Sequence, residues 1–399
     1  MSINFQTSIW LEIDNETDDI LALLLLQLLN FKFDHIVVGE SDPLLKAKQL
    51  VEGGYLFNSI SPIIIGLPSE KQHPIDPVLL EKSKNEEKEI NSNHYPAFKN
   101  KQEYRKCLLN YLISTPRPIL VVLKPPRELF ELIQDAANSS FNSFNSSNFE
   151  QKDEKQEEAI CILHLLKTRA ILYFYGSFNL RVLKPEHHQF HQFMKSFHQV
   201  YLFESFHALG LSNSINQHTM PHFFKTWNIL RKITEEVKGL KNLKEDKKDN
   251  QKENKKEKTK HINVLYPHFL IAFSNLDLWM KTWNEYILNQ KSFWLDSSAK
   301  AVKLVKDLEE NKNFQMVTAD MILALFVETD PKKLEQFAPL VNIDWDEKGM
   351  SRIVDKSELK LESSTSSSNL ISSVHLFQKL NWEELQYQLC SVLNIYKNH

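Results

Sequence analysis

Short apolar runs alternate with helical patterns through the first half of the chain. The runs are rich in β-branched and other apolar residues and are short enough for buried strands. Residues 20–29 and 44–57, which follow the first two runs, have the length and apolar content of helices. This strand–helix–strand rhythm predicts an α/β fold with a mainly parallel, Rossmann-like open central sheet flanked by helices. The predicted strands lie within residues 9–13, 35–40, 61–68, 117–123, 170–179 and 200–206.

Acidic residues follow the first predicted strand at unusual density. Because carboxylates this close together repel one another, the fold must offset their charge with a cation or with hydrogen-bond donors. The end of a strand and the start of the next helix face the crevice where open α/β sheets bind ligands. Oxygen ligands suit Ca²⁺ or Mg²⁺. In the alternative interpretation, Asp18 and Asp19 only cap the helix. The acids are Glu12, Asp14, Glu16, Asp18 and Asp19.

Residues 12–23, EIDNETDDILAL, resemble the N-terminal signature of the inosine/uridine nucleoside hydrolase family, D-x-D-P-G-x-D-D-x-x-A-L. The resemblance implies that family's fold and its use of Ca²⁺. By position, Asp14 is a metal ligand and the base that activates a calcium-bound water. Asp18 is the ribose ligand, and Asp19 is a calcium ligand. The chain departs from the signature at the first Asp, which is Glu12, and at Pro-Gly, which is replaced by Asn-Glu.

Two later strand ends follow the family's order with changed side chains. The pair Gly39–Glu40 resembles a family strand that ends in Gly-Asn, so Glu40 takes the place of a ribose contact. Residues 124–128, KPPRE, are similar to the family's G-P-L-T-N. This similarity implies that the backbone carbonyl of Arg127 binds calcium. Glu128 replaces an Asn that contacts the sugar in the family.

The resemblance continues in the second half of the chain. Glu204 occupies the place of a ribose-binding Glu, and Asn179 is a candidate substrate contact because Phe206 replaces the family's Asn. Asp320 matches the Asp of a late H-D-P-x-A-x-A segment, which implies a further calcium ligand. Ala319 stands where the family has the His that protonates the leaving base. An Asp at a helix start can also be a simple N-cap.

Composition narrows the function classes. Hydrophobic residues make up 42% of the 399 residues, which is enough for a substantial core, and the net charge of −3 gives no sign of nucleic-acid or membrane binding. The eight glycines form no phosphate loop or dinucleotide-binding motif. The three cysteines fit no metal or redox spacing. Without a signal segment or a membrane-spanning run, a cytoplasmic protein is expected, although an organellar compartment also fits.

Several segments lack a strand or core-helix pattern, and we expect a single domain over residues 1–399 that carries insertions. Residues 138–158 are rich in Asn, Ser and Phe and then charged, and residues 240–260 mix lysines with acids; both predict disordered loops. Residues 363–373 predict a Ser-rich linker to a C-terminal helix. The histidines between residues 187 and 222 match no zinc spacing with a cysteine, so we interpret them as composition.

Two hypotheses from different classes follow. In the first, the protein is a divergent calcium-dependent N-ribohydrolase that cleaves the N-glycosidic bond of a nucleoside or related riboside, a small-molecule substrate. In the second, it is a catalytically inactive relative that serves as a binding or assembly subunit, as a homo-oligomer or with a protein partner. The matching acids favour the first, and the altered sugar contacts favour the second. A third hypothesis, Mg²⁺-dependent phosphoryl transfer, lacks a phosphate loop.

Overall fold

The computed structural model describes residues 7–52, 55–56, 61–68, 98–99, 103–145, 154–204, 319–327, 331–345, 351–355 and 371–377, together with isolated helical residues between 232 and 310. The predicted loop at 240–260 and the predicted C-terminal helix lie outside these residues. No helix among the described residues is long and apolar enough to cross a membrane.

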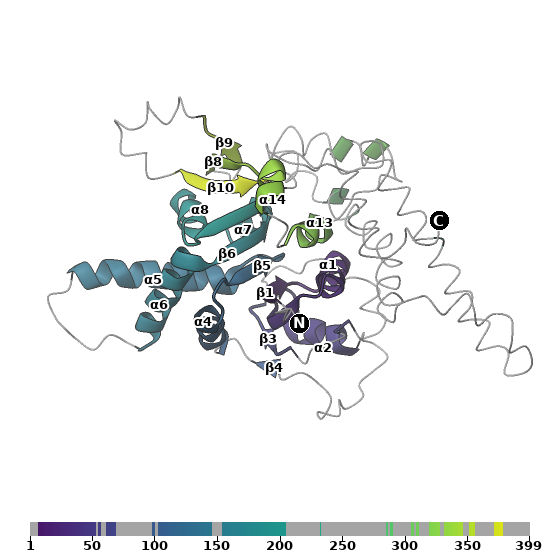
Figure 1. Cartoon of the computed structure of the whole chain (residues 1–399), viewed down its shortest axis with the longest axis horizontal. Coiled ribbons are helices and arrows are strands. Elements are labelled where there is room, and N and C mark those ends of the chain that lie inside the picture. Colours follow the sequence, from purple (N-terminus) through teal and green to yellow (C-terminus); the bar gives the residue numbers. More distant parts are fainter. Residues whose placement is uncertain are drawn as a thin grey trace, which may run out of the picture.

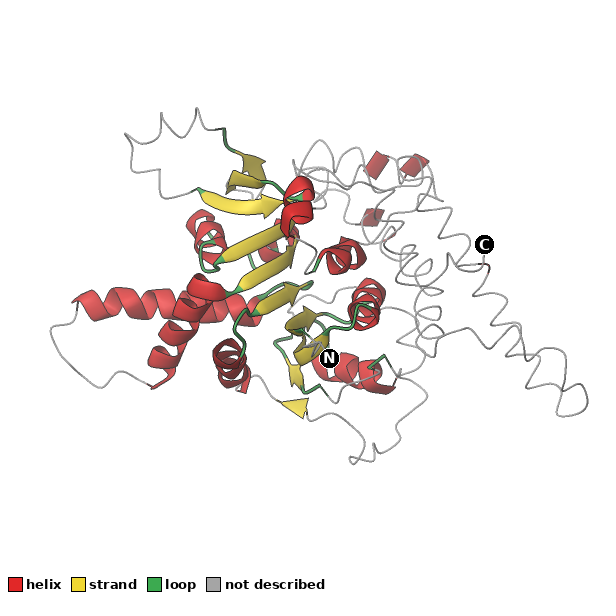
Figure 2. Cartoon of the chain, viewed as in Figure 1, coloured by secondary structure: helices red, strands yellow, loops and turns green. Residues whose placement is uncertain are grey.

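One sheet of ten strands forms the centre of the described part, in the order β4-β3-β2-β1-β5-β6-β7-β10-β8-β9. Neighbouring strands from β4 to β10 are parallel, whereas β8 is antiparallel to both β10 and β9. The mainly parallel α/β prediction is therefore confirmed (Figures 1 and 2). The strands are β1 Ser8–Ile13, β2 Lys32–Val38, β3 Ile63–Ile65, β4 Phe98–Lys99, β5 Ile119–Val122, β6 Ile171–Tyr175, β7 Gln199–Phe203, β8 Leu340–Trp345, β9 Ser351–Ile353 and β10 Ser372–Leu376.

Helices cover both faces of the sheet. In Figure 1, α1, α2 and α13 lie on one side, and α4, α5, α6 and α8 lie on the other. Two separate apolar clusters match this division, one under each set of helices. The helices are α1 Thr17–Leu28, α2 Pro43–Glu52, α4 Tyr104–Ser114, α5 Arg127–Asn145, α6 Glu154–Arg169, α7 Gly176–Arg181, α8 His187–Met194, α13 Ala319–Phe326 and α14 Pro331–Phe337.

Strand β1 lies in the middle of the sheet and is buried on both faces. Ile9, Leu11 and Ile13 join the cluster under α1, while Trp10 joins the cluster on the other face. This alternation follows from the two-residue period of a strand. Burial on both faces explains why the predicted parallel strands are continuous apolar runs rather than alternating patterns.

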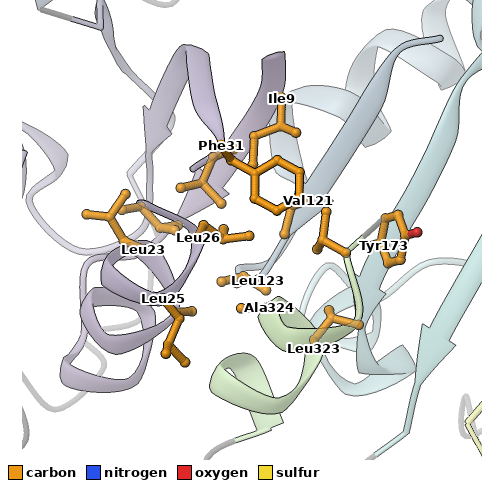
Figure 3. Close-up of a cluster of buried hydrophobic side chains, with 14 of the residues drawn as sticks. Ile9, Leu23, Leu25, Leu26, Phe31, Val121, Leu123, Tyr173, Leu323 and Ala324 are labelled. Carbon is orange, nitrogen blue, oxygen red and sulfur yellow. The ribbon is translucent and has the colours of Figure 1, made fainter. Parts of the chain in front are cut away.

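Helix α1 is buried along nearly its whole length, from Thr17 to Gln27. Figure 3 shows why: side chains of α1 and α13, among them Leu23, Leu26 and Leu323, gather over strand residues such as Val121. The helix is thus enclosed by the sheet and by a second helix that comes some 300 residues later in the chain. An all-round apolar helix is the expected sequence for such a position.

Three segments differ from the sequence-based expectation in the middle and at the end of the chain. The strand predicted for residues 170–179 ends at Tyr175, because Gly176 adopts a positive φ of 65° and begins α7. The loop predicted for residues 138–158 is helical at both ends, since α5 extends to Asn145 and α6 begins at Glu154. A helix formed upstream can continue through residues of weak propensity such as Asn and Ser.

The end of the predicted Ser-rich linker belongs to the sheet. Ser372 and Ser373 begin β10, which pairs with β7 on one side and β8 on the other. The Ser-rich composition concealed the alternation of buried and exposed positions along β10.

We expect Leu323→Ala to lower the free energy of unfolding by about 2–5 kcal/mol, because it removes a fully buried side chain where α13 meets α1. Leu44→Ala is the matched control, since Leu44 is 46% exposed, and should change stability by no more than about 0.5 kcal/mol. Urea unfolding of both variants measures the difference. Equal losses would contradict the enclosed position of α1.

Candidate metal and active site

The turn after β1 is shaped by Asn15. This residue has a φ of 59°, and its side-chain amide donates a hydrogen bond to the carbonyl of Lys46 in α2, 2.8 Å away. Asn tolerates a left-handed backbone better than most residues. Asn15 therefore provides the bend between Asp14, which precedes it, and the acids of α1, which follow it.

Three acids converge where the first turns of α1 and α13 meet. Asp18, Asp19 and Asp320 each place a carboxylate oxygen so that all three oxygens lie within 4.8 Å of one another. All three side chains are buried. The structure thus brings together Asp19 and Asp320, two predicted calcium ligands that are some 300 positions apart in the sequence. The third acid of the group is Asp18, predicted as the ribose ligand, and not Asp14.

The cluster leaves carboxylate oxygens without hydrogen-bond donors. Asp19 Oδ2 accepts the backbone N–H of Glu16, 3.1 Å away. The other oxygen of Asp19 and one oxygen of Asp320, both buried, have no hydrogen-bond partner among the described residues. Buried acceptors without donors are costly, so this arrangement fits a cation better than it fits helix capping alone.

Electrostatics lead to the same conclusion. Burial, together with the nearby charge of Asp14, raises the pKa of Asp18 to about 7. Burial and the charges of the neighbouring acids also raise the pKa of Asp19 and of Asp320 well above the usual range. Asp14, which is half-buried, acts on all three groups and therefore lies close to them. A group of acidic side chains this close together offers the oxygen donors that a hard divalent cation prefers.

Glu40, predicted to contact the substrate, lies in an ion pair. It follows β2 with a φ of 66° and is fully buried. Its Oε1 accepts a hydrogen bond from Nε of Arg127, 2.9 Å away. The acid that replaces the family's Asn is thus balanced by the side chain of the residue whose carbonyl is the predicted calcium ligand. That ligation by the Arg127 carbonyl remains a prediction.

Lys124, a fully buried cation, balances the charges of Glu12 and Glu128. Its Nζ lies 2.6 Å from Glu128 and 3.4 Å from Glu12, and all three side chains are buried. Burial alone would lower the pKa of Lys124, but the two carboxylates raise it above its usual value. Glu12 also accepts hydrogen bonds from the Tyr104 hydroxyl at 2.6 Å and from the Trp10 indole at 3.1 Å. The sequence-based analysis missed this role of Lys124.

The Lys124 cluster also explains two glycines at neighbouring strand ends. A Cβ on Gly39 would lie 2.9 Å from the Lys124 side chain, and a Cβ on Gly66 would lie 2.2 Å from Glu128 Oε1. A side chain at either position would have to displace the end of Lys124 or of Glu128. Glu40 and Glu128, two acids in place of the amides of the resembled family, were the available signal, because buried acids require a nearby cation.

Asn179 and Glu204 lie at the ends of other strands and take part in structural hydrogen bonds. The Asn179 amide on α7 donates to the carbonyls of Leu123 at 2.7 Å and Tyr175 at 3.0 Å, which ties α7 to the end of β5. Glu204, directly after β7, is buried and accepts a hydrogen bond from the Ser351 hydroxyl at 3.1 Å. Their predicted substrate contacts remain predictions.

Lys124→Met should lower the free energy of unfolding by about 3–5 kcal/mol, because it leaves Glu12 and Glu128 buried without their cation. The double variant Lys124→Met/Glu128→Gln should recover part of this loss. As a control, Arg105→Ala breaks the more exposed pair with Asp135 and should cost no more than about 1 kcal/mol. Chemical denaturation gives each value. A loss for Lys124→Met no larger than the control's would show that the buried acids do not depend on Lys124.

In the metal-free protein, the contribution of Asp18 to the free energy of unfolding should fall as the pH rises from about 4 to about 7. Its folded pKa of about 7 lies above the unfolded value of 3.8, so in this window the unfolded state ionises while the folded state stays protonated. Unfolding in chelator at several pH values measures the slope. Asp18→Asn should remove this component, whereas the exposed-site control Asp135→Asn should not; identical slopes in wild type and Asp18→Asn would contradict the assignment.

No protein-family model matches the sequence, and no curated protein matches it either. Among solved structures, an inosine-guanosine nucleoside hydrolase is similar with a TM-score of 0.52 and 10% identity, over 98% of this chain and 99% of its own. An inosine-uridine preferring nucleoside hydrolase from Bacillus anthracis has a TM-score of 0.46 and 12% identity, over 98% of this chain and 100% of its own. The similarity to the first structure confirms the fold that the signature implies: this chain has a nucleoside hydrolase-like α/β fold.

Proposed function

We propose that the protein is a divergent calcium-dependent N-ribohydrolase that acts on a nucleoside or related riboside. The observation that carries the proposal is the convergence of Asp18, Asp19 and Asp320, with buried carboxylate oxygens that lack hydrogen-bond donors among the described residues. The nucleoside hydrolase-like fold supports it. The cluster lies at the carboxyl end of the central strand β1, where open α/β sheets bind their ligands.

In this proposal Asp14, Asp19, Asp320 and the carbonyl of Arg127 hold the ion. When bound, Ca²⁺ supplies positive charge that orients and polarises water and sugar hydroxyls. Asp14 takes the proton of the attacking water as general base, which its half-buried position beside the cluster allows. Asp18 accepts hydrogen bonds from the ribose hydroxyls. The negative charge of these acids also stabilises the oxocarbenium-like charge that develops on the sugar.

The leaving base must depart without the family's acid, because Ala319 replaces the His. A base that already carries a positive charge leaves as a neutral molecule and needs no protonation. We therefore expect a ribosyl substrate with an alkylated, cationic base, such as 7-methylguanosine, to react faster than inosine. This expectation depends only on Ala319, which cannot donate a proton to the leaving base.

The ion pairs favour a second candidate function. Glu40 and Glu128 stand where the family has sugar-contacting amides. Glu40 pairs with Arg127, and Glu128 pairs with Lys124. Their charges are already paired, which fits a binding or assembly subunit whose cation is structural. Such a subunit would bind calcium and hydrolyse no riboside.

Excess Ca²⁺ should raise the melting temperature of the wild type relative to chelator, since a ligand at 100 times its Kd adds about 2.7 kcal/mol to the native state. Asp19→Ala should abolish the shift, whereas Asp135→Asn should retain it, because Asp135 is an exposed acid outside the cluster. A wild type that shows no calcium shift would remove the basis of the proposal.

Hydrolysis is tested separately with inosine, uridine and 7-methylguanosine as substrates. Asp14→Asn should lower the turnover of whichever riboside reacts by about 100-fold or more, the usual contribution of a general base. Calcium binding without turnover of any of the three would favour the subunit function. Turnover that Asp14→Asn leaves unchanged would show that the hydrolase assignment is wrong.

A further inference from the structure

A second group of metal-ligand side chains lies on the opposite side of the sheet from α1 and α13. Helix α8 places His187 and His191 one turn apart, so that both rings face strand β8. There, Nε2 of each histidine lies 3.2 Å from the same atom, Oδ1 of Asp344. The sequence analysis interpreted these histidines as composition because they match no zinc spacing with a cysteine; their partner lies more than 150 residues away.

The distances between these atoms match those of a metal centre. With zinc–ligand bonds of about 2.0–2.1 Å, neighbouring ligand atoms of a tetrahedral site lie about 3.3 Å apart. The two histidine–aspartate distances of 3.2 Å are within about 0.1 Å of that value. Two of the three distances in the group therefore suit zinc, and all three ligand atoms lie within 4.8 Å of one another.

Further contacts orient the ligands as in known metal sites. Nδ1 of His191 lies 3.0 Å from the Ser372 hydroxyl, which can accept its N–H and so leave Nε2 free to bind a metal. The second oxygen of Asp344 accepts a hydrogen bond from Arg352, and the backbone N–H of Trp345 donates to Oδ1 at 2.8 Å. Such outer contacts fix the ring orientation and the carboxylate plane.

We propose that His187, His191 and Asp344 form a site for a divalent transition-metal ion, with zinc as the ion that the geometry fits best. Two imidazoles and one carboxylate are a donor set typical of zinc, and the hard, oxygen-binding calcium ion does not prefer it. The His187 side chain is 33% exposed, so solvent can supply the fourth ligand. The site is independent of the proposed hydrolase function.

The zinc site would connect distant parts of the fold. Residues of α8 would be linked to β8, which lies beyond β10 near the edge of the sheet (Figure 1). Between His191 and Asp344 the chain runs through 153 positions, so the ion would close a long loop. Bound there, the ion would hold β8 against the helical layer, while the position open to solvent leaves room for a further ligand.

The test uses full-length protein that has been freed of metal with chelator and then titrated with Zn²⁺ against a chromophoric chelator. We expect one tightly bound ion in the wild type and at least tenfold weaker binding in His187→Ala. Ser372→Ala should weaken binding by about 10–100-fold through loss of ring orientation. His188→Ala is the matched control, because His188 is a 59% exposed neighbour that lies outside the group and should bind zinc like the wild type.

Two further measurements distinguish this site from the acidic cluster. Zinc binding should persist in Asp19→Ala and in excess Ca²⁺, and bound Co²⁺ should show the visible absorption of a tetrahedral complex. Metal-free melting curves check that His187→Ala folds normally. The proposal is overturned if His187→Ala binds zinc as tightly as the wild type, if binding is lost in Asp19→Ala instead, or if the wild type does not compete for zinc.

Discussion

Buried carboxylates at the ends of the central parallel strands must be matched by positive charge, and the arrangement around β1 depends on this requirement. On the β2 and β5 side, the protein supplies the charge itself: Lys124 lies between Glu12 and Glu128, and Arg127 pairs with Glu40. On the α1 and α13 side, Asp18, Asp19 and Asp320 meet with raised pKa values. This difference in charge matching is the reason that the proposed cation is assigned to the α1 and α13 side.

The same requirement links substitutions that look unrelated in the sequence. The family that this chain resembles has Gly and Asn at the first and last positions of its G-P-L-T-N segment. This chain has Lys124 and Glu128 there, and their side chains form an ion pair. Glycines at positions 39 and 66 leave the room that this pair occupies. Lys124, Glu128 and the two glycines thus form one packed arrangement, in which the charge of Lys124 is matched by Glu128.

How much the sequence could predict depended on how local each signal was. The β1–α1 unit was predictable because its strand, turn and helix are adjacent, and the signature of acids lies within it. Asp320 could be placed only through its order in a family pattern. The His187–His191–Asp344 group could not be predicted, because Asp344 comes from a distant strand. Lys124 was missed although Glu128 lies only four residues later, because its second partner, Glu12, is distant in the sequence. Strand β10 was missed because its serines are typical of linkers, although their alternate positions are buried in the sheet.

The enclosure of α1 by α13 has a consequence for the timing of folding during synthesis. Asp19 leaves the ribosome long before Asp320, and at about 5–20 residues per second the interval between them is about 15–60 s. Throughout that time the apolar surface of α1 lacks the helix that covers it, and the acids of its first turn lack Asp320. Nascent chains of this protein should therefore be good clients for chaperones until residue 326 has emerged.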